Sequence, residues 1–274
     1  MKKIMMLVAV CFLCVIQSVE AHTVTENNMY EDVAPTAENA QKILLLNSLG
    51  LLGYNGQDMK LGQDENLSRM EFAAWLAGFF HLEGDNFEQQ ANASLQEEYV
   101  SSLQGDLTYG ELNAALFHKK LKLDKPEATL TKAQYIDFIV EHLNEDMGGH
   151  TLVQMGGFME GPTGVIDDVK TADGAVTLTI DGKDYLLSGH PRISAQTDNA
   201  EEWAGKRVEL SYFTTSNSSH GHHHAEQQSN DEAALQYVQL EQTVAEDNTK
   251  SKWLMPAIII AVLAILALLF LKRK

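Results

Sequence analysis

The sequence predicts an α+β, multi-domain protein: an N-terminal all-α helical module, a small all-β barrel-like domain, a disordered linker and a single C-terminal transmembrane helix. Three observations predict this order. Ala, Leu and Ile recur at helical spacing within residues 29–145, β-branched residues alternate around an Asp-Gly turn within residues 147–213, and residues 253–271 are apolar throughout. Since each segment has its own periodicity, we expect each to fold separately.

Residues 1–21 have the three parts of a secretory signal peptide. Two lysines come first, an apolar run from Ile4 to Ile16 follows, and Val19-Glu20-Ala21 supplies the small residues of a cleavage site. The run is shorter than the roughly 20 apolar residues of a transmembrane helix. We therefore expect cleavage after Ala21. Both cysteines lie within the signal, so the mature chain should contain no disulfide.

Five segments within residues 29–145 carry apolar residues at helical spacing, so we expect about five helices there. These segments are residues 37–52, 70–82, 88–103, 111–121 and 133–143.

A short motif occurs three times in this region, at Leu67–Phe72, Leu107–Leu112 and Leu130–Tyr135. Each copy has an apolar residue, Ser or Thr, two variable residues, Glu or Gln, and a second apolar residue. This is a capping box, in which the hydroxyl and the Glu or Gln side chain satisfy two backbone N–H groups at the start of a helix. Three boxes predict a repeated helix-loop-helix unit.

The first copy belongs to a longer pattern. Tyr30-Glu-Asp-Val33, then Leu49-Gly-Leu-Leu-Gly-Tyr54, then Leu67–Ala74 resemble one S-layer homology repeat, and this match covers residues 29–82. It continues weakly to about residue 143, where the second and third boxes lack the arginine. The resemblance implies three repeats in a trimeric bundle that binds secondary cell-wall polymers such as pyruvylated glycans.

The resemblance also implies a ligand site. Arg69 would pair with an anionic sugar substituent, with Asp32 and the backbone of Gly53 near the same pocket. A guanidinium can hold a carboxylate in a two-pronged, charge-assisted contact. Each residue also has a structural explanation: Glu71 fits a helix cap, Asp32 fits a cap of the turn before the first helix, and Arg69 fits a surface ion pair.

A calcium-binding EF-hand is the competing interpretation of the acidic loop that ends at Glu71. Loop positions 1, 3 and 6 would then be Lys60, Gly62 and Glu65. The motif requires Asp, an oxygen ligand and Gly at these positions, which excludes it.

Residues 147–213 predict a small β domain. Strands are expected at 164–169, 175–180, 185–187 and 207–213, with a hairpin turn at Asp181-Gly182. Short strands over this length are typical of a small SH3-like or OB-like barrel. Because the domain has few basic residues, we expect a spacer or a protein-contact module rather than a nucleic-acid-binding one.

Residues 214–252 are poor in apolar side chains and predict a flexible linker. It contains a histidine-rich tract whose metal-ligating candidates are His220, His222, His223 and His224. Imidazole is a good ligand for Zn, Ni and Cu, and the tract could hold such an ion weakly. No closed tetrahedral site is implied, because the tract lacks a scaffold.

The apolar run at residues 253–271 would span close to 30 Å as a helix, about the thickness of the hydrocarbon core of a bilayer. Residues 272–274 form a basic tail, which the positive-inside tendency keeps in the cytoplasm. Residues 246–252 contain no LPxTG-type motif, so we favour a retained anchor over a sortase signal. We expect a single-pass protein of the cell membrane with its N-terminus outside and its C-terminus cytoplasmic.

The formal net charge of −18 opposes binding to nucleic acid, which depends on Lys and Arg neutralising phosphates. No nucleophile elbow, phosphate loop, zinc-protease helix or cysteine nucleophile is present, so we expect no enzyme and no resident cofactor. The leading hypothesis is an extracytoplasmic envelope protein that tethers cell-wall polysaccharide, or a partner envelope protein, to the membrane. The alternative is envelope metal handling by the histidine tract.

Overall fold

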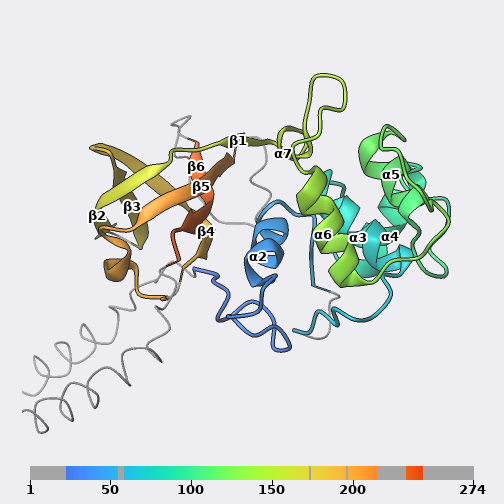
Figure 1. The fold of residues 1–274 in the computed structure, drawn as a ribbon, viewed down its shortest axis with the longest axis horizontal. Coiled ribbons are helices and arrows are strands. Elements are labelled where there is room, and N and C mark those ends of the chain that lie inside the picture. Colours follow the sequence, from blue (N-terminus) through green and yellow to red (C-terminus); the bar gives the residue numbers. More distant parts are fainter. Residues whose placement is uncertain (1–22, 55–58, 173, 196, 215–232, 243–274) are drawn as a thin grey trace, which may run out of the picture. The chain divides into compact units, whose positions relative to one another are not determined.

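The computed structural model describes residues 23–54, 59–172, 174–195, 197–214 and 233–242 (Figure 1). The predicted signal peptide, histidine tract, transmembrane helix and basic tail lie outside these residues. The chain divides into two units, residues 1–241 and 242–274, and the elements below belong to the first. Within the described part of the chain, no helix is long and apolar enough to cross a membrane.

The structure has the α+β composition that the sequence predicts, with helices followed by a mixed six-stranded sheet. The five expected helices are present, each shorter at its C-terminal end than its apolar pattern suggests. They are α2 (Ala40–Ser48), α3 (Arg69–Phe79), α4 (Phe87–Gln96), α5 (Tyr109–Phe117) and α6 (Lys132–His142). A short helix, α7 (Leu152–Met155), lies inside the predicted β region. Its cap, Thr151 with Gln154, is a further capping box beyond the three that the sequence predicts.

The three predicted capping boxes are confirmed. They begin helices α3, α5 and α6, and in each box both reciprocal hydrogen bonds are formed. The capping residues are Ser68 with Glu71, Thr108 with Glu111, and Thr131 with Gln134.

The chain segments that lead into the boxes are joined in a closed ring of backbone hydrogen bonds. The residue after each capping Ser or Thr donates its N–H to the carbonyl three positions before the next cap. These bonds join Arg69 to Gly105 at 3.0 Å, Tyr109 to Ala128 at 3.1 Å and Lys132 to Glu65 at 3.0 Å. The first box therefore bonds to the second, the second to the third and the third to the first. Isolated β-bridges between the same segments repeat this order.

The leucines that precede the three caps are buried: Leu67, Leu107 and Leu130 are each at most 1% exposed. Backbone hydrogen bonds connect Leu67 with both others. The buried leucine at the start of each motif is thus part of this hydrogen-bonded ring. The three motifs together have approximate three-fold symmetry.

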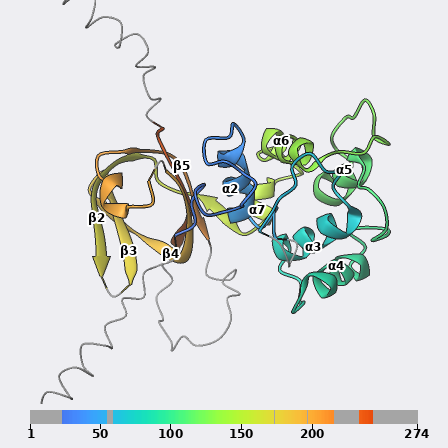
Figure 2. The ribbon, with the colours of Figure 1, turned by 90° about the horizontal axis from the view of Figure 1, so that it is seen from below.

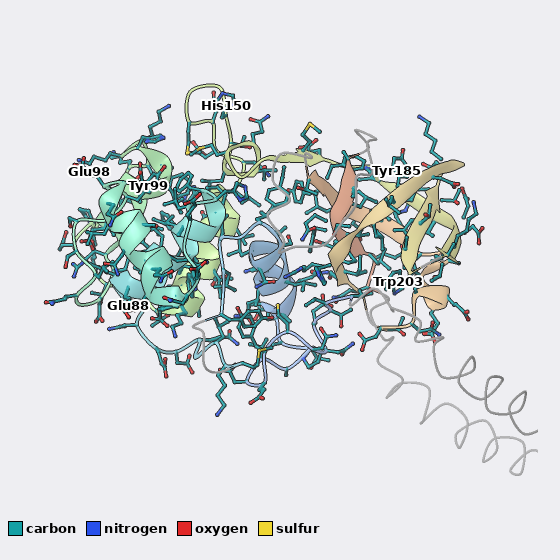
Figure 3. The ribbon with its side chains drawn as sticks, turned by 180° about the vertical axis from the view of Figure 1, so that it is seen from behind. Glu88, Glu98, Tyr99, His150, Tyr185 and Trp203 are labelled. Carbon is teal, nitrogen blue, oxygen red and sulfur yellow. The ribbon has the colours of Figure 1, made fainter. Side chains whose placement is uncertain are left out.

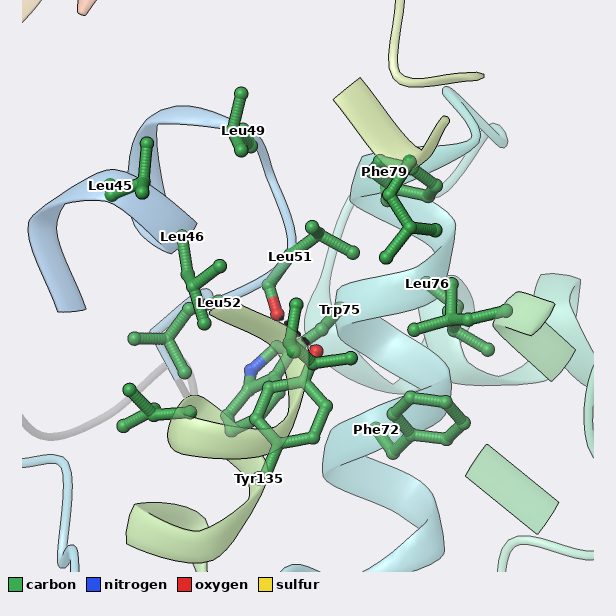
Figure 4. Close-up of a cluster of buried hydrophobic side chains, with 14 of the residues drawn as sticks. Leu45, Leu46, Leu49, Leu51, Leu52, Phe72, Trp75, Leu76, Phe79 and Tyr135 are labelled. Atoms are coloured by element: carbon green, nitrogen blue, oxygen red, sulfur yellow. Dashed lines mark hydrogen bonds between the residues drawn. The ribbon is translucent and has the colours of Figure 1, made fainter. Parts of the chain in front are cut away.

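The helical core is built around aromatic side chains (Figure 4). The ring of Trp75 lies 5.4 Å from the ring of Tyr135, and Phe72 meets the same ring edge-on at 6.1 Å. The fully buried Tyr135 hydroxyl donates to the carbonyl of Leu51 at 2.6 Å, which satisfies its polar group. This contact fixes the loop after α2 against α6.

The sheet contains β1 (Phe158–Glu160), β2 (Gly164–Ala172), β3 (Ala175–Ile180), β4 (Lys183–Ser194), β5 (Arg207–Thr214) and β6 (Ala234–Leu240). Its order is β1-β5-β2-β3-β4-β6, and β5 also pairs with β6. The extra pairing closes a five-stranded ring, which Figure 2 shows from below. Neighbouring strands are antiparallel except β4 and β6, which are parallel.

The predicted linker at residues 214–252 includes Ala234–Leu240, but this segment is β6 and closes the ring of strands. The predicted β domain at residues 147–213 therefore ends too early. Leu235, Tyr237, Val238 and Leu240 of β6 are all buried. Residues 214–252 are polar on average, and for this reason the sequence pattern does not reveal the short apolar strand within them.

The helical and β parts share a contact surface. Helix α2 contacts β4, β6 and α6 (Figure 1). The ring has its own core, with Ile166, Leu178 and Trp203 at most 1% exposed, whereas Tyr212 and Tyr237 belong to the core of the helices. The 3-10 helix η1 (Ala200–Trp203) supplies that tryptophan.

Candidate functional site

The junction between the first and second capping boxes holds the predicted ligand residue Arg69. Its position at the first turn of α3 is set by the Ser68 cap. The guanidinium Nε donates to Glu111 Oε1 at 2.8 Å, and Nη1 donates to the carbonyl of Gln104 at 2.5 Å. The Arg69 and Glu111 side chains are 23% and 31% exposed, so this ion pair is accessible to a ligand.

Glu111 serves both the cap and the ion pair. Its Oε2 accepts from the Thr108 backbone N–H at 3.0 Å while its Oε1 accepts from Arg69. Partial burial raises the pKa of this carboxyl, but the Arg69 and Thr108 hydrogen bonds outweigh it, and the net pKa is lowered. Glu111 is therefore charged at neutral pH, and a ligand anion must compete with it for Arg69.

A cavity of about 160 Å³ adjoins this ion pair. Its lining combines the pair with apolar, aromatic and hydroxyl groups: Arg69, Glu98, Tyr99, Val100, Ser101, Leu107, Glu111 and Ala114. We call this cavity the Arg69 groove. Figure 3 labels Glu98 and Tyr99, two of its lining residues.

Tyr99 is held in place by a parallel stack. Its ring lies 4.3 Å from that of Phe80, with 7° between the planes. The side chain is partly exposed and lines the groove. A fixed aromatic ring beside a guanidinium and a carboxylate can accept a ring-shaped polar ligand with an apolar face.

The other two junctions have different chemistry. Tyr109 occupies the position of Arg69 in the second box and packs edge-on against Phe138 at 5.3 Å. Lys132 occupies it in the third box, where the side chain is 4% exposed and bonds to Glu71 at 2.8 Å. Of the three junctions, the first alone combines an arginine with an adjoining cavity among the described residues.

The structure places the other two predicted ligand residues elsewhere. The Asp32 carboxylate accepts from the N–H groups of Leu61 and Gly62 at 2.8 and 2.7 Å, so it holds the turn that precedes α3 and not the turn before α2. Gly53 packs on the indole of Trp75, and its carbonyl accepts from Tyr30. Neither Asp32 nor Gly53 lines the Arg69 groove.

Of the groove residues, the sequence predicts only Arg69 as a ligand residue, and it gives no indication of Glu98, Tyr99 and Ser101. They follow α4, outside all three motifs, and Glu98 has a positive φ of 60°. The local sequence around them carries no signal of the site, because tertiary packing alone brings this loop to the first junction.

The candidate metal ligands His220, His222, His223 and His224 lie outside the described residues, so metal binding by this tract stays a prediction. Among the described residues, no cluster of three or more His, Cys, Asp or Glu side chains could hold a metal ion. In comparisons with known proteins, no family model, no curated protein and no solved structure matches the chain.

Proposed function

We propose that this chain is a membrane-anchored, extracytoplasmic envelope protein whose S-layer-homology-like helical module binds an anionic cell-wall polymer in the Arg69 groove. The observation that carries this proposal is the partly exposed Arg69–Glu111 pair beside a 160 Å³ cavity and the stacked ring of Tyr99. The ring of three capping boxes supports the proposed family resemblance, since related repeats would occupy equivalent positions.

The groove chemistry favours a carboxylate-bearing sugar. Arg69 offers a planar donor to a carboxylate, and Tyr99 offers an aromatic face to the apolar side of a sugar ring. Glu111 and Glu98 border the same cavity, so a polyanion held by charge alone would be repelled. Binding therefore requires a single, well-placed anionic substituent.

The β ring is proposed to be a spacer of OB-like form. An OB-like form is supported by the pairing of the five strands. Strand β6 closes the ring, because it pairs in parallel with β4 and antiparallel with β5. In this proposal the ring separates the groove, in chain order, from the predicted anchor at residues 253–271.

The test is co-sedimentation of the full-length chain, in mild detergent, with purified sacculi that carry or lack their secondary polymer. Arg69→Ala should abolish polymer-dependent sedimentation. Lys42→Ala is the matched control, because Lys42 also forms an ion pair, with Asp137, but lies outside the groove. Sedimentation that persists in Arg69→Ala, or that needs no polymer, would refute the proposal.

A further inference from the structure

The N-terminal segment of the described chain is bound along β4. The Val24 N–H donates to the carbonyl of Pro191 at 3.0 Å, and the Ile193 N–H donates to the carbonyl of Val24 at 2.9 Å. Strand β3 pairs only with the first part of β4, up to Leu186, and β6 pairs with the other edge. Residues 23–28, which we call the N-terminal clasp, thus cover an edge of β4 that no other described strand occupies.

Polar contacts at the loop after β4 secure the clasp. The Thr25 hydroxyl donates to Asp198 Oδ1 at 2.5 Å, and Asn27 Nδ2 donates to the same oxygen at 2.8 Å. Asp198 Oδ1 therefore accepts two hydrogen bonds from the clasp, from Thr25 and from Asn27.

Glu26 is the buried acidic group of the clasp, with 4% of the residue exposed. Its Oε2 accepts from the Ala195 N–H at 3.3 Å, which is a long bond. Its Oε1 and the Ser194 Oγ are buried without a hydrogen-bond partner among the described residues. A buried carboxylate needs several donors or a cation, and this site gives Glu26 poor compensation for its charge.

Among the described residues, two titratable groups face Glu26. Asp198, in the loop after β4, is a negative neighbour that disfavours ionisation of Glu26. The phenol of Tyr237, on β6, is uncharged because burial raises its pKa. Burial is the largest influence and raises the pKa of Glu26. The nearby Ser194 hydroxyl, although it makes no well-formed hydrogen bond, and the N–H groups of Glu26 and Ala195 lower the pKa by less.

We propose that Glu26 is a proton-dependent latch: its neutral carboxylic acid holds the N-terminal clasp on β4, and its ionised form releases the clasp. Release would leave the C=O of Pro191 and the N–H of Ile193 open to another extended segment. The neutral form gains free energy from the native site, so the latch is complete below the ordinary carboxyl pKa of 4.5. The attachment of the clasp weakens as pH rises through the raised pKa that Glu26 has in the native protein.

Hydrogen exchange measured by mass spectrometry on the full-length chain in detergent tests the latch. Exchange of residues 23–28 is converted to protection factors at pH 5 and pH 8, which removes the intrinsic pH dependence of exchange. The hairpin of β3 and β4 serves as the internal reference. Protection of the clasp should fall roughly tenfold between the two pH values if ionisation releases it.

Glu26→Gln, which cannot ionise, should keep the clasp protected at both pH values. Glu31→Gln is the matched control, because Glu31 is exposed and close to Glu26 in the sequence, and it should behave as the unaltered chain does.

If Glu26→Gln does not fold, Asp198→Asn replaces it. Loss of the negative neighbour should move the pH of clasp release to a lower value. Clasp protection that is equal at pH 5 and pH 8 in the unaltered chain would overturn the latch. So would a Glu26→Gln variant that loses protection as the unaltered chain does, or a transition that Asp198→Asn leaves in place.

Discussion

The ammonium group of Lys132 is buried and lies 2.8 Å from Oε1 of Glu71, the capping glutamate of the first box. This pair has the same place at the third junction that Arg69 and Glu111 have at the first. Lys132 Nζ also donates to the carbonyl of Leu61 at 2.9 Å. The residue after the capping Ser or Thr thus has different roles in different boxes. Lys132 forms a buried ion pair that joins the third box to the first, whereas Arg69 lines the Arg69 groove.

Lys132→Met should lower the free energy of unfolding by about 3 kcal/mol, because removal of one partner leaves the Glu71 carboxylate without its cation. Chemical denaturation measures this loss. The matched control is Lys42→Met, whose pair with Asp137 is 40% and 62% exposed and should contribute less than about 1 kcal/mol. Equal losses in the two variants would show that burial does not strengthen the Lys132 contact.

Local sequence patterns predict the helices and the capping boxes well. A capping box is a contact between residues three positions apart, so Ser68 and Glu71 specify it wherever the helix packs. The hairpin at Asp181-Gly182 is predictable for the same reason, since Asp181 has a φ of 47° and Gly182 a φ of 75°.

The Arg69 groove and the closure of the five-stranded β ring are harder to predict, because both depend on contacts between residues that are distant in the sequence. Glu111 is 42 positions from Arg69, and no periodicity links them. Strand β6 completes the ring from a segment whose average composition is polar, and only Leu235, Tyr237, Val238 and Leu240 signal it. The sequence suggests Asp32 as a ligand residue or as a cap of the turn before the first helix, whereas its carboxylate accepts from Leu61 and Gly62, which are distant in the chain.

Gly105→Ala should disturb the Arg69 groove. Gly105 has a φ of +81°, and an added Cβ would lie 2.9 Å from Arg69 Nη1, so the guanidinium must move. We expect weaker polymer-dependent sedimentation and a stability loss of about 1 kcal/mol. Gly182→Ala is the control, since its φ is +75° but nothing lies within 4 Å of the added atom. It should lose similar stability and keep full sedimentation; a binding loss in both variants would contradict the steric argument.

Arg192→Met should weaken the contact between α2 and the β ring. Arg192 Nε donates to Asn47 Oδ1 at 3.1 Å, and Asn47 is 8% exposed. Burial lowers the pKa of this guanidinium, while the Tyr54 and Tyr30 hydroxyls raise it by less. Loss of the charged donor should reduce the free energy of unfolding by about 2 kcal/mol. Arg207→Met, at an exposed position on β5, should change it by less than about 0.5 kcal/mol, and calorimetry would compare the two.

Asp32 should make the first repeat sensitive to acid. Partial desolvation raises the pKa of its carboxyl, but the N–H groups of Leu61 and Gly62 outweigh this effect, and the net pKa lies below the ordinary value of 3.8. A lowered native pKa means that the carboxylate stabilises the fold above the ordinary value, and that this contribution is lost as pH falls through the native value. Thermal unfolding from pH 7 to pH 2 should therefore show a steeper acid loss in the unaltered chain than in Asp32→Asn, which keeps one acceptor oxygen but cannot ionise. Parallel pH profiles for the two chains would mean that the turn cap is independent of the Asp32 charge.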